Sequence, residues 1–237
     1  MIRQVLVCLM VSSAALIAQR PKSEAAAVAN LEQVQDGPER LRHRAARDLG
    51  RFDGESATRA LCRELERAQT ASYQMTVVQA IGNRRRRGAV APLLSAFRQC
   101  EAARLCEAQA EAMRKQGEVG VTALADELAQ VRGKRAHRQA ICYALARVDD
   151  HVGARDGLLA EIEAAANADQ LQPLQGLAGW QGDEKVDAVR TLLAKGKNLL
   201  VAGTAVQQLA DHRHQDAPEL ALQLFRRMPK DGRGDIF

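Results

Sequence analysis

The chain has 237 residues with a net charge of +5, and 46% of its residues are hydrophobic whereas only 3% are aromatic. This hydrophobic content is enough for a buried core in one or two domains. Because the apolar residues are mainly Ala and Leu, the composition favours closely packed helices and argues against a sheet-rich fold.

The N-terminal segment has the features of an export signal. A basic start at Arg3 is followed by an uncharged, mostly apolar stretch from Gln4 to Gln19, with small residues near Ala18. This pattern predicts a signal peptide over residues 1–18, with a second possible cleavage point in the Ala run at residues 25–27. The mature protein is then expected to be secreted or periplasmic, without a stable membrane span. An uncleaved anchor or a buried first helix is the alternative.

Three further segments follow the predicted signal. Residues 19–37 read as a linker with a weak helix, and the turn at residues 36–38 can start the first regular helix with Pro38 near its first position. Residues 38–228 form the predicted repeat domain. The last segment, 229–237, is polar and Gly-rich, and it is expected to be a flexible tail.

A five-residue pattern organises the repeat domain, because it occurs six times at a constant interval of 32 residues. The copies begin at residues 46, 78, 110, 142, 174 and 206, and each contains a large aliphatic residue at its fourth position. Those aliphatic residues are Leu49, Ile81, Met113, Leu145, Leu177 and Leu209. A fixed period of this length without insertions indicates an array of structural repeats.

Each repeat reads as a helix, a short turn and a second helix. In the first unit Leu41, Ala45 and Leu49 share one stripe, the pattern breaks at residues 53–54, and a second stripe contains Ala57 and Leu61. Apolar residues at this spacing mark one face of an amphipathic helix. Such helix pairs cannot bury their apolar faces alone, so the chain is predicted to be an all-α solenoid of about six helical hairpins.

The repeats resemble a known family. The pattern A-x-x-L-G at the end of the first helix, with A-x-P-L-L in the second, has approximate counterparts here in Val78-Gln79-Ala80-Ile81-Gly82 and Ala89-Val90-Ala91-Pro92-Leu93-Leu94. This pattern resembles the HEAT repeat, and the short period is most similar to the variant named after the phycobilisome lyases. The resemblance covers about residues 38–228. It implies the solenoid fold, whereas HEAT arrays serve as scaffolds, adaptors, lyases and even DNA glycosylases.

The constant period also predicts a surface. Residues just after the fourth position of each pattern should line up along the row of turns, where basic residues recur in four neighbouring units. The predicted ridge contains Arg51, Arg84, Arg85, Arg86, Arg87, Arg114, Lys115 and Arg147, and Trp180 follows in the fifth unit. Exposed guanidiniums suit carboxylates, phosphates or sulfated glycans. The alternatives are solvated turns that only keep the protein soluble, and a Trp180 ring that folds back onto its own turn.

Four cysteines lie outside the predicted signal. Cys100 and Cys106 flank an inter-helix turn, so they can approach to bridging distance, whereas Cys62 and Cys142 lie in distant repeats. An even number of cysteines in an exported protein permits disulfides. The alternative is that all four are buried, reduced thiols.

The sequence contains no motif that supports catalysis, such as a phosphate loop, a nucleophile elbow or paired His ligands on a helix. His212, His214 and Asp216 make only a weak metal pattern, and Asp216 is better explained as the N-cap of the last helix. No cofactor or metal is expected.

We therefore expect an exported, non-catalytic HEAT-repeat scaffold or adaptor that binds a protein partner, and an acidic partner would suit the predicted ridge. A lyase-type or chaperone-like accessory subunit acting on a protein partner is the alternative. Nucleic-acid binding is not expected, because acidic residues along the helices offset the basic ones and because such binding fits poorly with export. The oligomeric state stays open.

Overall fold

We describe the protein from a computed structural model, in which residues 20–131, 134–148, 151–163, 177, 183–195 and 199–228 are described. These residues form helices joined by turns, with no strands among them. The chain divides into two compact units, Met1–Gly117 and Glu118–Phe237. The predicted signal at residues 1–18 and the predicted tail at residues 229–237 lie outside the described residues.

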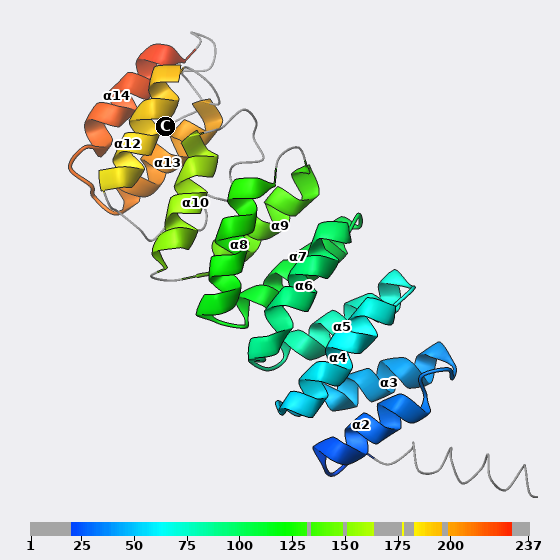
Figure 1. The fold of residues 1–237 in the computed structure, drawn as a ribbon. Coiled ribbons are helices and arrows are strands. Elements are labelled where there is room, and N and C mark those ends of the chain that lie inside the picture. The colour runs from blue at the N-terminus through cyan, green and yellow to red at the C-terminus, as the bar shows by residue number, and fades with distance from the viewer. Residues whose placement is uncertain are drawn as a thin grey trace, which may run out of the picture. The chain divides into compact units, whose positions relative to one another are not determined.

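The N-terminal unit contains six α-helices and one short 3₁₀ helix among its described residues. They are α2 (Glu24–Gln33), α3 (Glu39–Leu49), α4 (Glu55–Arg67), α5 (Ala71–Gly82), η1 (Arg87–Ala89), α6 (Val90–Gln99) and α7 (Ala103–Arg114). Helices α3, α5 and α7 pack side by side in one layer, and α2, α4 and α6 pack in the other (Figure 1). Each helix thus contacts the next but one along the chain.

The C-terminal unit contains a further six helices in the part that the structure describes. They are α8 (Glu118–Gln130), α9 (Arg135–Leu145), α10 (Val152–Glu163), α12 (Asp183–Lys195), α13 (Leu199–Asp211) and α14 (Ala217–Arg227). Here α10 packs against both α8 and α12, and α13 packs against α12 and α14. Both units are therefore all-α arrangements in which contacts run between neighbouring helices, which confirms the predicted fold class.

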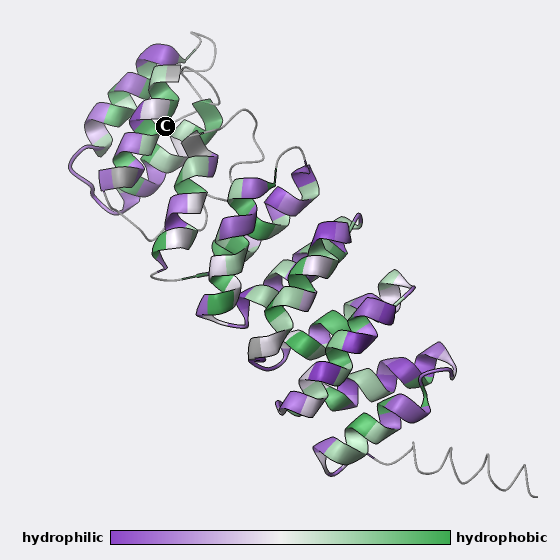
Figure 2. Ribbon diagram, in the orientation of Figure 1, coloured by the Kyte–Doolittle hydropathy of each residue, from purple (hydrophilic) through white to green (hydrophobic). Residues whose placement is uncertain are grey.

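The predicted repeat register is confirmed by burial. Leu49, Ile81, Met113, Leu145, Leu177 and Leu209 are all buried, at 3% exposure or less. Each of them that belongs to a described helix lies near its C-terminal end. Hydrophilic and hydrophobic residues alternate along each helix because one face is buried and the other is exposed (Figure 2).

Small residues let the first-layer helices approach closely. A Cβ added to Gly50 would lie 2.8 Å from the Cβ of Ala80, and one added to Gly82 would lie 3.2 Å from the Cβ of Ala112. The Gly at the end of one pattern thus contacts the Ala inside the next pattern. This contact explains why small residues recur beside the large aliphatic residue.

In the N-terminal unit the pairing of helices differs from the predicted hairpins, whereas in the C-terminal unit α13 packs on α14 as predicted. The sequence predicts that α3 and α4 form one unit, whereas α4 packs more extensively on α5, and α6 packs more extensively on α7 than on α5. The period identifies equivalent positions in successive units. The period does not determine whether a helix packs more extensively on the helix before it or on the helix after it.

Helix α2 lies in the segment that was expected to be a linker with a weak helix. The Ser23 side chain caps its first turn, and Ala27 and Leu31 are buried. A carboxylate oxygen of Glu24 accepts a hydrogen bond of 2.9 Å from the backbone N–H of Ala57, in the first turn of α4. A carboxylate is favourable at a helix N-terminus, so α2 is a packed part of the array. None of the helices in the described ranges has the length and apolar character needed to cross a membrane.

Candidate functional site

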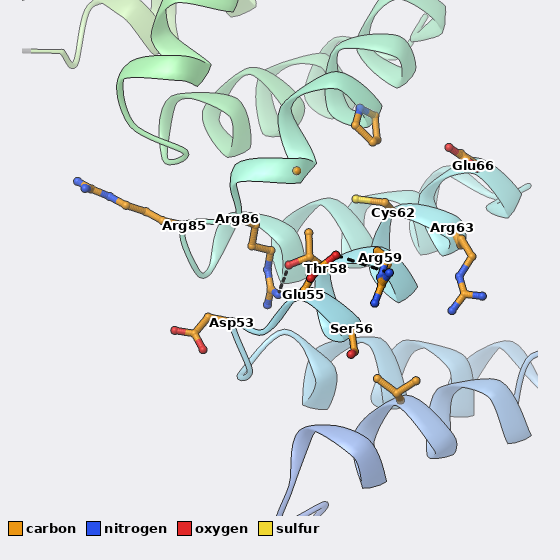
Figure 3. Close-up of a pocket in the computed structure, with 13 residues that line it drawn as sticks. Asp53, Glu55, Ser56, Thr58, Arg59, Cys62, Arg63, Glu66, Arg85 and Arg86 are labelled. Carbon is orange, nitrogen blue, oxygen red and sulfur yellow. Dashed lines mark hydrogen bonds and ion pairs between the residues drawn. The ribbon is translucent and has the colours of Figure 1, made fainter.

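Arg86 was predicted to be exposed on the basic ridge, and this prediction is wrong. Its side chain is only 2% exposed, and its guanidinium lies between two repeats (Figure 3). One terminal nitrogen donates to Thr58 Oγ1 at 3.2 Å, and the other donates to the carbonyl oxygens of Gly50, at 3.3 Å, and Phe52.

These contacts give Arg86 a structural role. Gly50 and Phe52 follow the last turn of α3, where carbonyl groups have no partner within the helix. A guanidinium with several donors can satisfy two of them together. Burial lowers the pKa of Arg86, whereas nearby Asp53 acts in the opposite direction. Arg86 therefore joins the turn of its own repeat to the turn of the preceding one.

Gln116 makes the matching connection to the following repeat. Its side-chain amide donates to the carbonyl of Arg84 at 3.3 Å, and its amide oxygen accepts from the backbone N–H of Arg86 at 2.5 Å. The next residue, Gly117, has a φ of +79°, which a residue with a side chain rarely adopts. The turns after α3, α5 and α7 are therefore held together as one continuous edge.

The other predicted ridge residues of the N-terminal unit are distributed unevenly along this edge. Arg51, Arg84 and Arg85 are exposed, as is Lys115. Arg114 is half-buried and forms two hydrogen bonds with Glu111, at 2.8 and 2.7 Å. The carboxylate of Glu111 also lies 3.8 Å from the Lys115 amine, so it offsets part of their charge.

Two more predictions extend into the C-terminal unit. The Arg147 guanidinium lies 3.6 Å from the centre of the Tyr143 ring on the preceding helix and donates to its hydroxyl. A ridge that continues beyond residue 117, into the C-terminal unit, stays a prediction. The side chain of Arg87 and the whole of Trp180 lie outside the described residues.

A groove of about 900 Å³ lies beside this edge in the second layer of helices. Helix α4, which packs between α2 and α6, forms its floor (Figure 3), and Val28 of α2 and Pro92 of α6 also line it. Arg85 and Arg86 line it as well, so the groove reaches the edge formed by the turns. Sequence reasoning missed the groove, because the period predicts a layer of second helices and not the spacing between them.

The groove presents charges of both signs. Arg59 lies 3.5 Å from Glu55, and Arg63 lies 3.6 Å from Glu32, with all four side chains more than half exposed. Ion pairs as exposed as these contribute little to stability, so a ligand can replace them at small cost. Cys62 also lines the groove, but burial raises its pKa to about 11, which keeps the thiol protonated at neutral pH.

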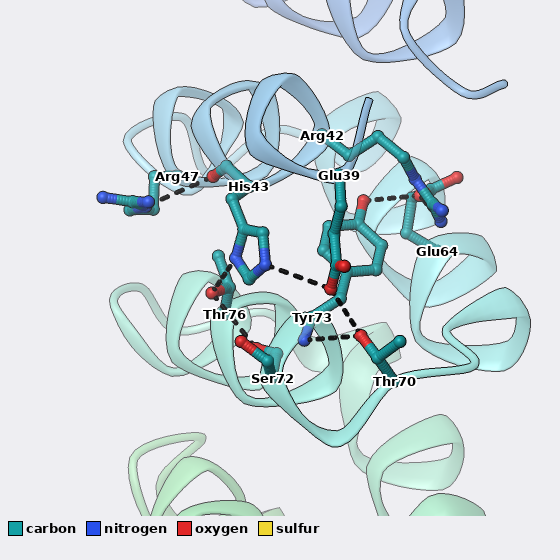
Figure 4. A network of polar contacts seen from close by, with 9 residues as sticks. All are labelled: Glu39, Arg42, His43, Arg47, Glu64, Thr70, Ser72, Tyr73 and Thr76. Carbon is teal, nitrogen blue, oxygen red and sulfur yellow. Dashed lines mark hydrogen bonds and ion pairs between the residues drawn. The ribbon is translucent and has the colours of Figure 1, made fainter. Parts of the chain in front are cut away.

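A second polar cluster connects α3, α4 and α5 (Figure 4). The buried Tyr73 hydroxyl donates to Glu64 at 2.6 Å, and the Arg42 guanidinium lies 4.3 Å from the centre of the Tyr73 ring. His43 Nδ1 lies 2.6 Å from Thr76 Oγ1. Burial, with a contribution from Glu64, raises the pKa of Tyr73.

This cluster contains residue types that are common in acid–base sites, but its polar groups contact one another across the helix interface. It therefore acts as a buried connection between neighbouring repeats. Sequence reasoning missed this cluster, although Glu64 and Tyr73 occupy positions in phase with the buried stripe of their helices.

The cysteines are all free thiols among the described residues, and all four are buried. Cys100 and Cys106 do lie close together, since the Cys106 thiol interacts with that of Cys100. Burial raises the pKa of Cys106 to about 12. The predicted disulfide is thus not formed in the structure, although its two residues are neighbours.

The last helix begins as predicted, but its capping differs. Asp216 occupies the N-cap position of α14 without a side-chain capping bond, and its carboxylate lies 3.3 Å from Arg190 instead. His214 Nδ1 accepts from the backbone N–H of Asp216 at 3.3 Å. Within the described ranges, no group of three or more His, Cys, Asp or Glu side chains is placed to hold a metal ion.

Comparisons with known proteins identify no relative. No family model matches the chain, and no curated protein and no solved structure matches it either.

Proposed function

We propose that this protein is an exported HEAT-like repeat scaffold that holds a segment of a partner protein in the groove along α4. The observation that carries the proposal is the groove itself, which is about 900 Å³ in volume and is built on helices that contact one another in register. Helical repeat arrays commonly use extended surfaces of this kind for binding. The export proposal is supported by the signal-like sequence of residues 1–18.

The chemistry of the groove suits a polypeptide. Its walls provide apolar contact at Val28 and Pro92, and the floor offers Arg59 and Arg63 beside Glu55. A polypeptide segment can bring apolar and charged side chains together, and the weak ion pairs of the floor can be exchanged for pairs with it. Because neighbouring repeats fix the groove, a ligand does not have to order it.

Site-specific crosslinking in the native cell tests this proposal. A photoreactive residue would replace Ser56 or Arg59 in the groove, and Glu107, which is exposed on α7, would serve as the control. Both groove positions are expected to crosslink the same protein, identified by mass spectrometry, and the control position is not. Adducts that are identical at all three positions, or absent from all of them, contradict the proposal.

The identified partner allows a second measurement. The double variant R59E/R63E reverses two charges in the groove and is expected to weaken binding about tenfold or more. An unchanged dissociation constant for the purified pair means that the groove is not the binding site.

A further inference from the structure

The turns of the first three repeats carry exposed positive charge. We define the basic edge as Arg51, Arg84 and Arg85. All three side chains are exposed, and none has a hydrogen bond or ion pair among the described residues. By contrast, Arg59, Arg63 and Arg114 in the same unit each have a carboxylate partner. The basic edge therefore brings three guanidiniums that have no carboxylate partner onto two adjoining turns.

The basic edge is held in place by the buried contacts beneath it. Arg86 ties the turn of the second repeat to the carbonyls of the first, and Gln116 ties it to the third. The Arg85 guanidinium lies over the next turn, because a Cβ added to Gly117 would be 3.9 Å from its Cζ. The charges consequently belong to turns that are fixed relative to one another, which reduces the entropy lost on binding.

Charge complementarity indicates an anionic ligand, and the surroundings of the edge limit its kind. Asp53 is exposed on the first of these turns, and Glu55 and Glu66 line the adjoining groove. A continuous polyanion such as a nucleic acid or a sulfated glycan would meet these carboxylates wherever it left the edge. A polypeptide can place carboxylates only where the guanidiniums lie, and it can continue into the groove past Arg85, which lines both.

We propose that the basic edge binds an acidic segment of the partner protein, whose carboxylates pair with Arg51, Arg84 and Arg85 while the adjoining residues lie in the groove. Guanidiniums form strong, directional hydrogen bonds with carboxylates. This inference rests on the proposed function, since it specifies the partner's chemistry at the end of the same groove.

The test measures the binding of a fluorescent peptide of about 12 residues in which Glu alternates with Ser, by anisotropy at low salt. The variant R84E/R85E reverses two charges of the edge, and R40E/R104E is its control with the same net charge. Arg40 and Arg104 are exposed, have no partner among the described residues, and lie at the start of α3 and α7, opposite the turns. Circular dichroism would confirm that both variants fold.

The expected result is that R84E/R85E weakens peptide binding about tenfold or more, whereas R40E/R104E changes it less than about twofold. Equal weakening by both variants would show a general charge effect and overturn the inference, as would no weakening by either. A single-stranded oligonucleotide or a heparin fragment that binds the edge more tightly than the peptide, with the same sensitivity to R84E/R85E, would also overturn it. The crosslinking at Ser56 and Arg59 is independent of these results, so it can succeed where this inference fails.

Discussion

Replacing Arg86 is the most informative single perturbation of the array. In the variant R86M the carbonyl groups of Gly50 and Phe52 lose their donor, and so does the Thr58 hydroxyl. Each hydrogen bond from a charged donor contributes about 1.5–3 kcal/mol to the free energy of unfolding. Removing the buried charge offsets part of this loss of stability, because burying the guanidinium itself costs free energy.

The loss of hydrogen bonds should outweigh the gain from removing the buried charge, because the two carbonyls belong to the backbone and stay buried without a donor after the substitution. We therefore expect R86M to lower the free energy of unfolding by about 2–4 kcal/mol. The variant R86K keeps the charge but has fewer directional donors. Its free energy of unfolding should therefore lie between those of R86M and the wild type.

Urea unfolding followed by circular dichroism measures these differences. The control variant R84M/R85M removes exposed side chains and should stay within about 0.5 kcal/mol of the wild type. The reasoning is refuted if R86M also stays within about 0.5 kcal/mol, or if the control is as destabilised as R86M.

Three further predictions concern packing and buried ionisable groups. G50A should destabilise the protein by about 1–3 kcal/mol, because its Cβ would lie 2.8 Å from that of Ala80, whereas G88A, with its nearest neighbour at 4.0 Å, should be neutral in thermal unfolding. Equal effects of the two substitutions would contradict the close contact between repeats. Burial lowers the pKa of Lys185 from 10.5 to about 8. Between these two pH values the unfolded chain therefore binds more protons at this residue than the folded protein does. The contribution of Lys185 to the free energy of unfolding should rise by about 1 kcal/mol from pH 7 to pH 9. Comparison of the wild type with K185M isolates this contribution, and parallel pH profiles would disprove it. Finally, Cys62, Cys106 and Cys142 should react slowly with iodoacetamide at pH 8 until the protein is denatured, because burial raises their pKa values to about 11 to 12. Mass spectrometry that finds these residues labelled rapidly in the native protein would show that they are accessible.

The period of the sequence was sufficient to predict the class of fold and the register of the repeats. Leu49 and its equivalents are buried because the same helix face recurs in each unit, and this face can be read from apolar spacing alone. Helix α2 was underestimated, because its Ala-rich sequence resembles a linker, whereas its packing depends on the contact between Glu24 and the start of α4. Contacts between residues about 30 positions apart are not visible in a local pattern.

The candidate site was only partly predictable for the same reason. Four consecutive arginines occupy one turn, and nothing in the sequence distinguishes Arg86 from Arg84 and Arg85. The difference arises because the chain directs one side chain inward, where the carbonyls of Gly50 and Phe52 need donors. The groove along α4 was also beyond sequence reasoning, since its width depends on how far α2 and α6 lie from each other.

Hydrogen–deuterium exchange with and without the acidic peptide tests most directly whether the turns form one binding surface. We predict that saturating peptide slows exchange together in the turns at residues 50–54, 83–88 and 114–117, and in the first turn of α4. Slowed exchange at the opposite ends of these helices, or only in residues 118–228, would contradict the assignment of this edge and groove as the binding surface.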